Sequence, residues 1–234
     1  MHLGVFASFA EARDFAAGRG VRPGYAIDQE LWRERHTKLA AHDYPALFWL
    51  GHAATAGCRV FDLGGSVGVT YLAFKRLLAL LASVDWEVCE LPDVVARGAQ
   101  IAERLHERRL TFTTDMTRLA GCDILFAAGA LQFIEDPLEV QLERSTSRPR
   151  HLLINRLPVV EDHPTFVTLQ NTGQSIAPCR VVHGPTFIDR MSRLGYLLVD
   201  RWRCFENSLE IPFQPDLHLD WFQGFYFARD QVPS

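Results

Sequence analysis

Short apolar runs alternate with helical segments between Cys58 and Asn155, and this alternation constrains the fold more than any other feature of the sequence. The runs have the length of buried strands, and the segments between them carry apolar residues at helical spacing. Strands and helices that alternate at this interval predict a parallel, doubly wound α/β sheet. The expected strands are residues 59–63, 86–91, 110–113, 123–128 and 151–155, and the expected helices are 67–83, 94–108 and 137–144.

The start of the chain is helical and aromatic in character. Ser8 and Glu11 have the spacing of a capping box, and Asp28 is placed to cap a further helix. We therefore expect a helical N-terminal extension or lid over residues 1–56, ahead of a main domain over residues 57–234. The helices expected after the first one are residues 28–43 and 45–56.

The C-terminal third completes the predicted sheet. After residue 156 the pattern loosens into a stretch with Pro and Gly that ends at Pro185, and we expect an irregular loop there. A helix at 186–194 and strands at 196–205 and 221–228 follow, which gives a mostly parallel sheet of seven strands. The last strand is rich in aromatic residues and is a candidate homodimer face.

Composition excludes several classes of function. With 24 Lys+Arg against 28 Asp+Glu the net charge is −4, so neither a nucleic-acid nor a membrane partner is expected. The first residues lack the basic region of a signal peptide, and the longest apolar stretch, residues 77–82, is too short for a membrane span. None of the five cysteines forms a CxxC pair, which favours buried thiols in a cytoplasmic protein without a metal.

A glycine-rich loop follows the first predicted strand of the main domain and precedes a helix. Such a loop lets a ligand approach the backbone at the carboxyl end of a parallel sheet. Ser66 breaks the G-x-G-x-x-G pattern of dinucleotide-binding loops. The pattern is instead D-x-G-x-x-x-G, typical of a loop that binds S-adenosylmethionine (SAM), and its residues are Asp62, Gly64, Gly65, Ser66 and Gly68.

Acidic residues follow the next two predicted strands. Glu90 ends the second strand, next to Leu91, where a carboxylate accepts hydrogen bonds from two ribose hydroxyls. Asp115 and Met116 follow the third strand, where an acid and an apolar side chain border an adenine. Each acid has a structural alternative: Asp62 as a cap of the loop, Glu90 as a solvated strand end and Asp115 as an N-cap. The ligand interpretation is favoured, more strongly for the loop and Glu90 than for Asp115.

Four stretches together resemble a group of SAM-dependent methyltransferases found in bacteria, often near polysaccharide or secondary-metabolite genes. The resemblance implies a Rossmann-like class I methyltransferase fold, with SAM as cofactor and S-adenosylhomocysteine as product. It implies that Gly64, Gly65 and Glu90 contact SAM and that Ala128, Leu131 and Gln132 line its methionine end. Asn155 stands where relatives often have Asp, and His183-Gly184 where they often have an aromatic residue. The stretches are residues 61–68, 86–92, 131–137 and 154–158.

Methyl transfer depends chiefly on alignment, and a hydroxyl acceptor also needs a general base. His163 and His183 lie in the segment expected to face the acceptor, and Arg156 is placed to bind an acceptor carboxylate or to pin the loop by an ion pair. Tyr25 is the best candidate for a side chain that closes over SAM.

We therefore expect a SAM-dependent O-methyltransferase that acts on a small-molecule or sugar acceptor. The alternative is a SAM-binding protein without methyl transfer. The glycine spacing disfavours a third class, the nicotinamide-dependent oxidoreductases.

Overall fold

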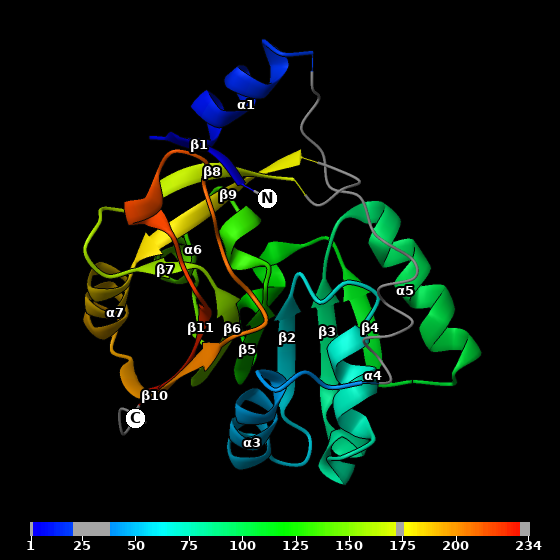
Figure 1. The fold of residues 1–234 in the computed structure, drawn as a ribbon. Helices are drawn as coiled ribbons and strands as arrows, with labels where there is room; N and C mark the ends of the chain where they lie inside the picture. Colours follow the sequence, from blue (N-terminus) through cyan, green and yellow to red (C-terminus); the bar gives the residue numbers. More distant parts are fainter. Residues whose placement is uncertain (1, 21–37, 172–175, 230–234) are drawn as a thin grey trace.

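Seven strands form the central sheet of the protein, and a computed structural model describes residues 2–20, 38–171 and 176–229 (Figure 1). The strand order is β10-β11-β6-β5-β2-β3-β4. Strands β2 to β6 pair in parallel, and β11 is antiparallel to both of its neighbours. The mostly parallel seven-stranded sheet is thus confirmed. Its strands are β2 (Arg59–Leu63), β3 (Asp85–Cys89), β4 (Leu110–Thr113), β5 (Ile124–Ala128), β6 (His151–Leu157), β10 (Leu197–Cys204) and β11 (Phe222–Ala228).

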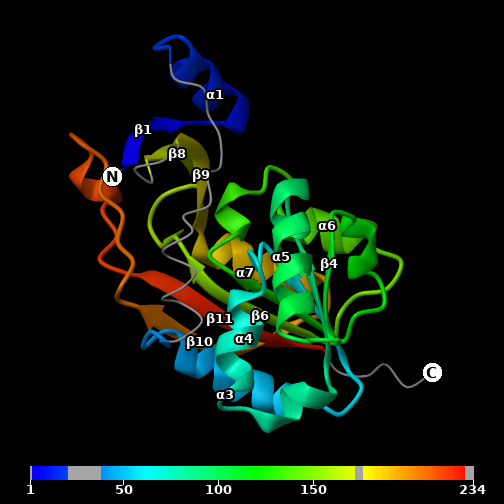
Figure 2. The ribbon, with the colours of Figure 1, turned by 90° about the vertical axis from the view of Figure 1, so that its right-hand side faces the viewer.

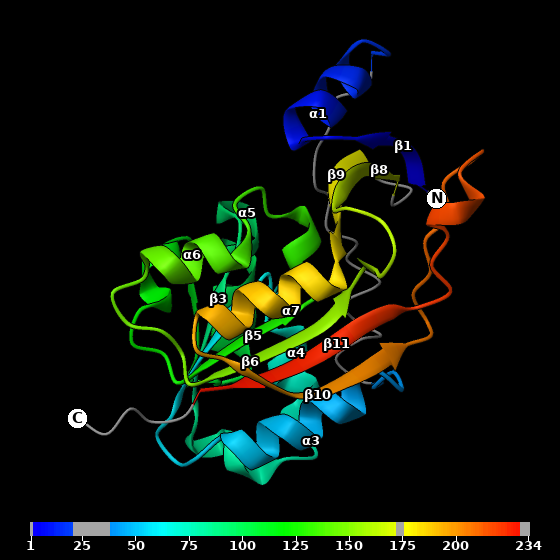
Figure 3. The same ribbon diagram turned by 90° about the vertical axis from the view of Figure 1, so that its left-hand side faces the viewer.

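Helices cover both faces of this sheet, so its central strands are apolar on both sides (Figures 2 and 3). One core includes Leu50 of α3 (Asp43–Ala53) and Phe74 of α4 (Val69–Lys75), and α5 (Pro92–Arg104) adds Ala102. The other core lies under α6 (Leu138–Arg144) and α7 (Gly184–Arg193). The single helix expected at 67–83 is wrong, because extended backbone at Leu78 separates α4 from a 3₁₀ turn, η1 (Ala79–Ser83). The other 3₁₀ turns are η2 (Met116–Leu119), η3 (Leu131–Phe133) and η4 (Pro215–Leu217).

A second sheet stands above the carboxyl ends of the main strands, at the top of Figure 1. We call it the cap sheet; its order is β1-β8-β9-β7. Helix α1 (Phe9–Ala17) covers it, and Phe9, Val167 and Leu169 share a small core there. The irregular loop expected at 157–185 is therefore wrong. The strands are β1 (His2–Phe6), β7 (Val159–Val160), β8 (Phe166–Asn171) and β9 (Ile176–His183).

Two features of the sequence hid these strands. Residues 166–169 are all buried because β8 is covered on both faces, so the apolar–polar alternation of a half-buried strand is absent. Proline usually interrupts a strand, yet Pro178 lies on β9 opposite Leu169 of β8. At that point β9 has a partner on one side only, since β7 pairs with Val182 and His183. Proline is tolerated where its missing N–H faces away from a partner strand.

The start of α1 confirms the expected cap. Ser8 Oγ accepts a hydrogen bond of 3.1 Å from the N–H of Glu11, and Glu11 Oε2 accepts one of 2.8 Å from the N–H of Ala7. Residues 28–37 of the second expected helix lie outside the described residues. The division of the chain at residue 56 stays a prediction.

The remaining expected features concern cysteines and membranes. All five cysteines are free and buried, as expected for reduced thiols. Across residues 2–20, 38–171 and 176–229, no helix has the length and apolar character that a membrane span requires.

A buried amide joins the start of α3 to the ends of two strands. Asn155 Nδ2 donates to the carbonyl oxygen of His42 at 3.1 Å and lies 3.4 Å from Asp43 Oδ1. Its Oδ1 accepts from Trp202 Nε1 at 3.1 Å and from Cys204 Sγ at 3.3 Å. Only 1% of Asn155 is exposed, so these groups have no water to replace a lost partner. The amide therefore fixes α3 against the carboxyl edge of the sheet.

Asn155→Leu should destabilise the protein by about 2–4 kcal/mol, because it leaves the Trp202 N–H and the His42 carbonyl buried without this partner. Urea denaturation measures the loss. The control is Gln100→Leu on the exposed side of α5, which should stay within about 0.5 kcal/mol of wild type. Equal stability of the two variants would show that the network contributes nothing.

Candidate active site

The glycine loop connects the carboxyl end of β2 to α4, at the sheet edge where β3 and β5 also end (Figure 1). Gly64 has φ +70°, and a Cβ on it would lie 2.3 Å from Cβ of Ala130. A Cβ on Gly65 would lie 2.2 Å from Asp62 Oδ2. Both positions thus require glycine, since a side chain at either would collide with its neighbour. Gly68, with φ +83°, ends the loop as the N-cap of α4.

Asp62 lies fully buried beneath this loop. Its Oδ2 accepts a hydrogen bond of 3.0 Å from Trp86 Nε1, and Oδ1 makes none in the described part of the chain. The pKa of Asp62 is raised to about 7, chiefly by burial and to a smaller extent by the charge of Glu90. The hydrogen bond from Trp86 and the charge of Arg156 act in the opposite direction. A buried carboxyl group with an unsatisfied oxygen and a strongly raised pKa is more frequent at functional sites than elsewhere, which makes this loop the candidate site.

Glu90 ties the end of β3 to the same loop. Its Oε1 accepts from the N–H of Ser66 at 3.2 Å, and its Oε2 accepts from the N–H of Leu91 at 2.9 Å. Ser66 has φ +54°, an uncommon angle for a residue other than glycine, and the Glu90 hydrogen bond supports it. Burial raises the pKa of Glu90, and the two backbone hydrogen bonds counter that rise. Glu90 is therefore more than a solvated strand end, because its carboxylate is bonded to the backbone of the glycine loop.

Asp115 and Met116 lie at the neighbouring strand end. Asp115 Oδ1 accepts from the N–H of Thr117 at 2.9 Å and from its hydroxyl at 2.6 Å, so Asp115 is the N-cap of η2. These hydrogen bonds lower the pKa of Asp115. Met116 Sδ lies 3.5 Å from Cys89 Sγ at the end of β3, and the Leu91 side chain is exposed. A role for any of the three in ligand binding stays a prediction.

The turn after β5 packs onto the glycine loop. Ala128 ends the strand, and Gly129 follows with φ +72° and donates its N–H to Asn155 O at 2.8 Å. Leu131 and Gln132 begin η3 and are buried. Gln132 is 5% exposed, and its Oε1 has no hydrogen-bond partner in the described structure.

Arg156 reaches this turn from the end of β6. Its Nη2 donates to the carbonyl oxygen of Ala128 at 2.7 Å. A Cβ on Gly129 would lie 3.3 Å from the guanidinium, so the two groups are in close contact. Arg156 has φ +59°, in the left-handed region. This backbone conformation is energetically unfavourable for residues other than glycine, and such residues cluster at functional sites.

His183 is the last residue of β9 in the cap sheet, and His163 lies between β7 and β8. His163 Nδ1 donates to Pro164 O at 2.8 Å, because a carbonyl can only accept. His183 Nε2 donates to Glu161 O at 2.9 Å, and its Nδ1 lies 2.7 Å from the hydroxyl oxygen of Thr186. The structure thus joins Ser66 directly to Glu90 and places the Asp62 carboxyl against Gly65. The contacts of the two histidines lie instead at β8, at α7 and just after β7. Tyr25 lies outside the described residues.

The cap sheet is bound to the turn after β5 by two arginines that the sequence analysis missed. Arg180 of β9 donates to Ile134 O at 2.8 Å and also to Glu135 O. Arg13 of α1 makes two hydrogen bonds of 2.9 and 3.0 Å to the Glu135 carboxylate. These pairings join segments far apart in the chain, so nothing in local spacing marks them. Trp86 was also missed, although an indole N–H in a buried strand needs a partner.

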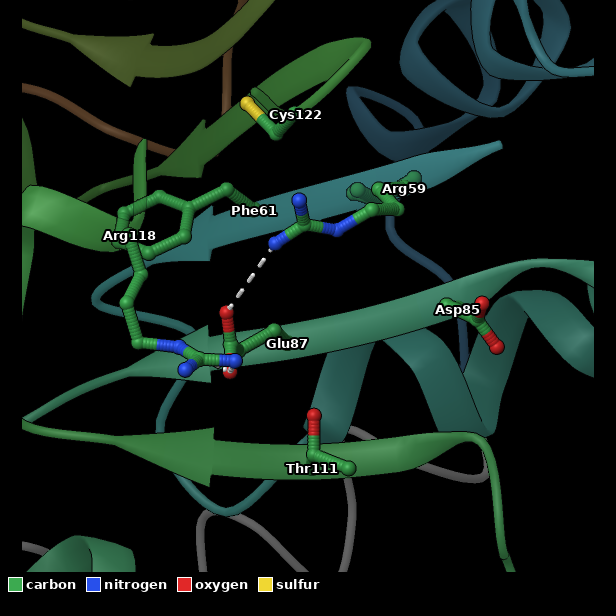
Figure 4. A pocket seen from close by; sticks show the side chains of 8 residues that line it. Arg59, Phe61, Asp85, Glu87, Thr111, Arg118 and Cys122 are labelled. Atoms are coloured by element: carbon green, nitrogen blue, oxygen red, sulfur yellow. Dashed lines mark hydrogen bonds and ion pairs between the residues drawn. The ribbon is translucent and has the colours of Figure 1, made fainter. Parts of the chain in front are cut away.

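A separate hollow of about 130 Å³ lies over the amino-terminal halves of β2 and β3 (Figure 4). Glu87 is at its centre, with Arg118 2.7 Å away and Arg59 4.0 Å away. None of the expected site residues lines it. No group of three or more His, Cys, Asp or Glu side chains placed to hold a metal occurs among the described residues.

Comparison with known proteins identifies this architecture. No family model and no curated protein matches the sequence. The solved structures that match include the 1,6-didemethyltoxoflavin-N1-methyltransferase of Burkholderia thailandensis, crystallised with 1,6-didemethyltoxoflavin and S-adenosylhomocysteine. The two chains are 18% identical, the match covers 93% of this chain and 86% of that one, and the TM-score is 0.54.

Two further structures extend this comparison. The magnesium protoporphyrin IX methyltransferase of Synechocystis PCC 6803 is 12% identical over 93% and 97% of the two chains, with a TM-score of 0.54. The glycopeptide N-methyltransferase MtfA is 11% identical over 83% and 92%, with a TM-score of 0.55. Both hold S-adenosylhomocysteine. The chain therefore has the Rossmann-like fold of class I SAM-dependent methyltransferases, as the resemblance of its motifs implied.

The raised pKa of Asp62 predicts a pH dependence of stability. A carboxyl whose pKa is about 7 when folded and near 3.8 when unfolded holds its proton more tightly in the folded state between those values. Its contribution to the unfolding free energy therefore falls as pH rises from about 4 to about 7, by roughly 4 kcal/mol. We expect the difference in stability between wild type and Asp62→Asn to change by this amount over that range, in urea denaturation at each pH.

The control for this experiment is Asp115→Asn. Asp115 is exposed and its pKa is lowered, so its contribution has the opposite sign and is lost as pH falls. A wild-type minus Asp62→Asn difference that stays constant between pH 4 and pH 8 would contradict the raised pKa.

Proposed function

We propose that the protein is a SAM-dependent methyltransferase that methylates an oxygen of a small-molecule or sugar acceptor. One observation carries the proposal: a buried carboxylate, a loop that requires glycine and a second carboxylate bonded to that loop meet at one sheet edge. Three methyltransferases that share the fold hold S-adenosylhomocysteine in their structures, which supports the same ligand here.

The residues at this edge fit SAM. The Asp62 carboxyl supports the loop from below at Gly65, and the loop leaves room that a Cβ would fill. Glu90 has the chemistry to accept hydrogen bonds from ribose hydroxyls, since its carboxylate is already oriented by Ser66 and Leu91. The proposed cofactor set is Asp62, Gly64, Gly65, Ser66, Gly68, Glu90, Leu91, Asp115, Met116, Ala128, Leu131 and Gln132, with Tyr25 proposed from the sequence alone.

Methyl transfer requires the acceptor oxygen to lie in line with the sulfur and the methyl group. When bound, SAM supplies an electrophilic methyl group on a sulfonium. The chain's own residues would hold an acceptor hydroxyl in line with that methyl group and take the hydroxyl proton, so that transfer would leave S-adenosylhomocysteine and a methyl ether. The cap sheet supports this alignment, because Arg180 and Arg13 hold it to the turn after β5.

His163 is better suited than His183 to act as this base. The Nδ1–H of His163 donates to Pro164 O, which leaves the lone pair on Nε2 as its basic site. In His183 the Nε2–H donates to Glu161 O, so the lone pair is on Nδ1, where the Thr186 hydroxyl donates to it. The lone pair of His183 is therefore already engaged.

Glu90→Ala should weaken S-adenosylhomocysteine binding about 10- to 100-fold, because it removes charge-assisted hydrogen bonds to the ribose. Isothermal titration calorimetry measures the affinity. The matched control is Glu87→Ala, two positions before the end of β3, whose carboxylate pairs with Arg118 away from the loop. Wild-type affinity in a folded Glu90→Ala variant would rule out the ribose role, and no binding to wild type would refute the proposed function.

His163→Ala should lower the rate of methyl transfer about 100-fold or more, as expected for loss of a general base, while S-adenosylhomocysteine affinity stays near wild type. Release of S-adenosylhomocysteine from SAM, screened over sugars and other hydroxyl compounds, identifies the acceptor and gives the rate. His183→Ala serves as the comparison. Binding of SAM without transfer to any acceptor would favour a SAM-binding protein that is not an enzyme.

A further inference from the structure

The connection between β10 and β11, residues 205–221, projects from the molecule beside β1 (Figures 2 and 3). We call it the connector. Two backbone hydrogen bonds of 2.9 Å join Leu209 and Leu219 across it. Its apolar side chains Leu209, Ile211 and Leu217 are buried in the core of the main sheet. Because it is anchored at these points, the connector is held as a fixed projection.

A tight turn presents Phe213 at the tip of the connector. The N–H of Gln214 donates to Ile211 O at 3.1 Å, so Pro212 and Phe213 are the central residues of the turn. Phe213 has φ +63°, and a positive angle at the second central position is typical of a type II turn, where glycine or asparagine is preferred. A phenylalanine is energetically unfavourable there. Its side chain is 99% exposed, so packing in the described structure does not account for it.

The charge on the connector has one sign. It contains neither lysine nor arginine, and its acidic residues are Glu206, Glu210, Asp216 and Asp220. Its histidine, His218, lies 3.8 Å from the Glu210 carboxylate and 3.0 Å from that of Asp220. Even when His218 carries a proton, the carboxylates outnumber it. Basic side chains of another molecule would therefore meet favourable charges around the tip.

These features are those of an anchor at a protein interface. Aromatic side chains are enriched in interfaces, and the residues that contribute most to binding fill pockets of the partner. A turn that is already fixed in the free protein lowers the entropy cost of association. The carboxylates around Phe213 favour a basic protein surface, and they oppose binding to a membrane, whose cytoplasmic surface is itself negative.

We propose that the connector is a docking surface for a protein partner, with Phe213 inserted into an apolar pocket that lysine and arginine side chains surround. This inference is independent of the proposed methyl transfer, because no residue of the connector belongs to the proposed SAM site and His163 lies outside it.

Photocrosslinking in the full chain identifies the partner. One sample carries a photoreactive phenylalanine analogue in place of Phe213. A control sample carries it in place of Leu105, an exposed leucine at the end of α5. Both are irradiated in a lysate of the organism that makes the protein, and the crosslinked proteins are identified by mass spectrometry. We expect a protein that the analogue captures at position 213 and not at position 105.

Calorimetry with that protein in purified form tests the contacts. Phe213→Ala should weaken its binding about 10- to 100-fold, as for loss of an interface anchor, whereas Leu105→Ala should change it less than about twofold. Wild-type affinity should fall about 10-fold between about 50 and about 500 mM NaCl, because salt screens the carboxylates. Asp216→Asn should reduce this salt dependence.

Loss of affinity both in Phe213→Ala and in salt would support the docking surface. The absence of any capture at position 213, or capture of a second copy of this chain alone, would overturn it. So would a partner that binds Phe213→Ala as tightly as wild type, or one whose affinity is the same at both salt concentrations. S-adenosylhomocysteine affinity should be equal in Phe213→Ala and wild type, so either result leaves the proposed function standing.

Discussion

The hydrogen bond between Trp86 and the buried carboxylate of Asp62 is the interaction on which the rest of the site depends. It joins the neighbouring strands β2 and β3 at the point where the glycine loop begins. Because that carboxylate fills the space above β2, residue 65 has no room for a side chain, and the loop must turn as it does. Glu90 then fixes the far side of the loop through Ser66. One buried acid therefore sets the shape of the loop.

The cap sheet and α1 also constrain the position of the turn after β5. Arg180 binds the backbone just after η3, and Arg13 binds the adjoining Glu135 carboxylate, so two separate parts of the cap hold one short segment. That segment packs Ala130 against Gly64. The cap and the glycine loop are thus linked by direct contacts through this one segment. This arrangement suits an enzyme in which the acceptor side and the cofactor side have to be aligned with each other.

Local patterns in the sequence were enough to predict the main sheet, because each strand–helix unit carries its own apolar period and its own turn. The same holds for the Ser8 cap and for the Gly64–Gly68 loop, whose geometry is set by neighbours in sequence. The cap sheet was missed because its strands are buried on both faces and pair with distant residues, and because Pro178 is tolerated only through the lack of a partner on one side. Arg180 and Trp86 were missed for the same reason: their partners are set by tertiary structure. Asp115 shows a different limit of sequence analysis. An N-cap and a ligand contact both favour an aspartate at this position, so the sequence alone does not distinguish them.

The pairing of β1 with β8 has a consequence for how the chain assembles. Thr168 Oγ1 donates to Leu3 O across a separation of 165 residues, whereas the parallel pairs β2–β3, β3–β4 and β5–β6 of the main sheet each join consecutive strands of the chain. Contacts over such separations close large loops, and their entropy cost makes them slow to form. All five parallel strands from β2 to β6 precede β8 in the chain, so they emerge from the ribosome before the partner of β1 does. We therefore expect the apolar side chains of β1 and α1 to remain without their partners through most of synthesis, and the cap sheet to become ordered after the parallel strands of the main sheet.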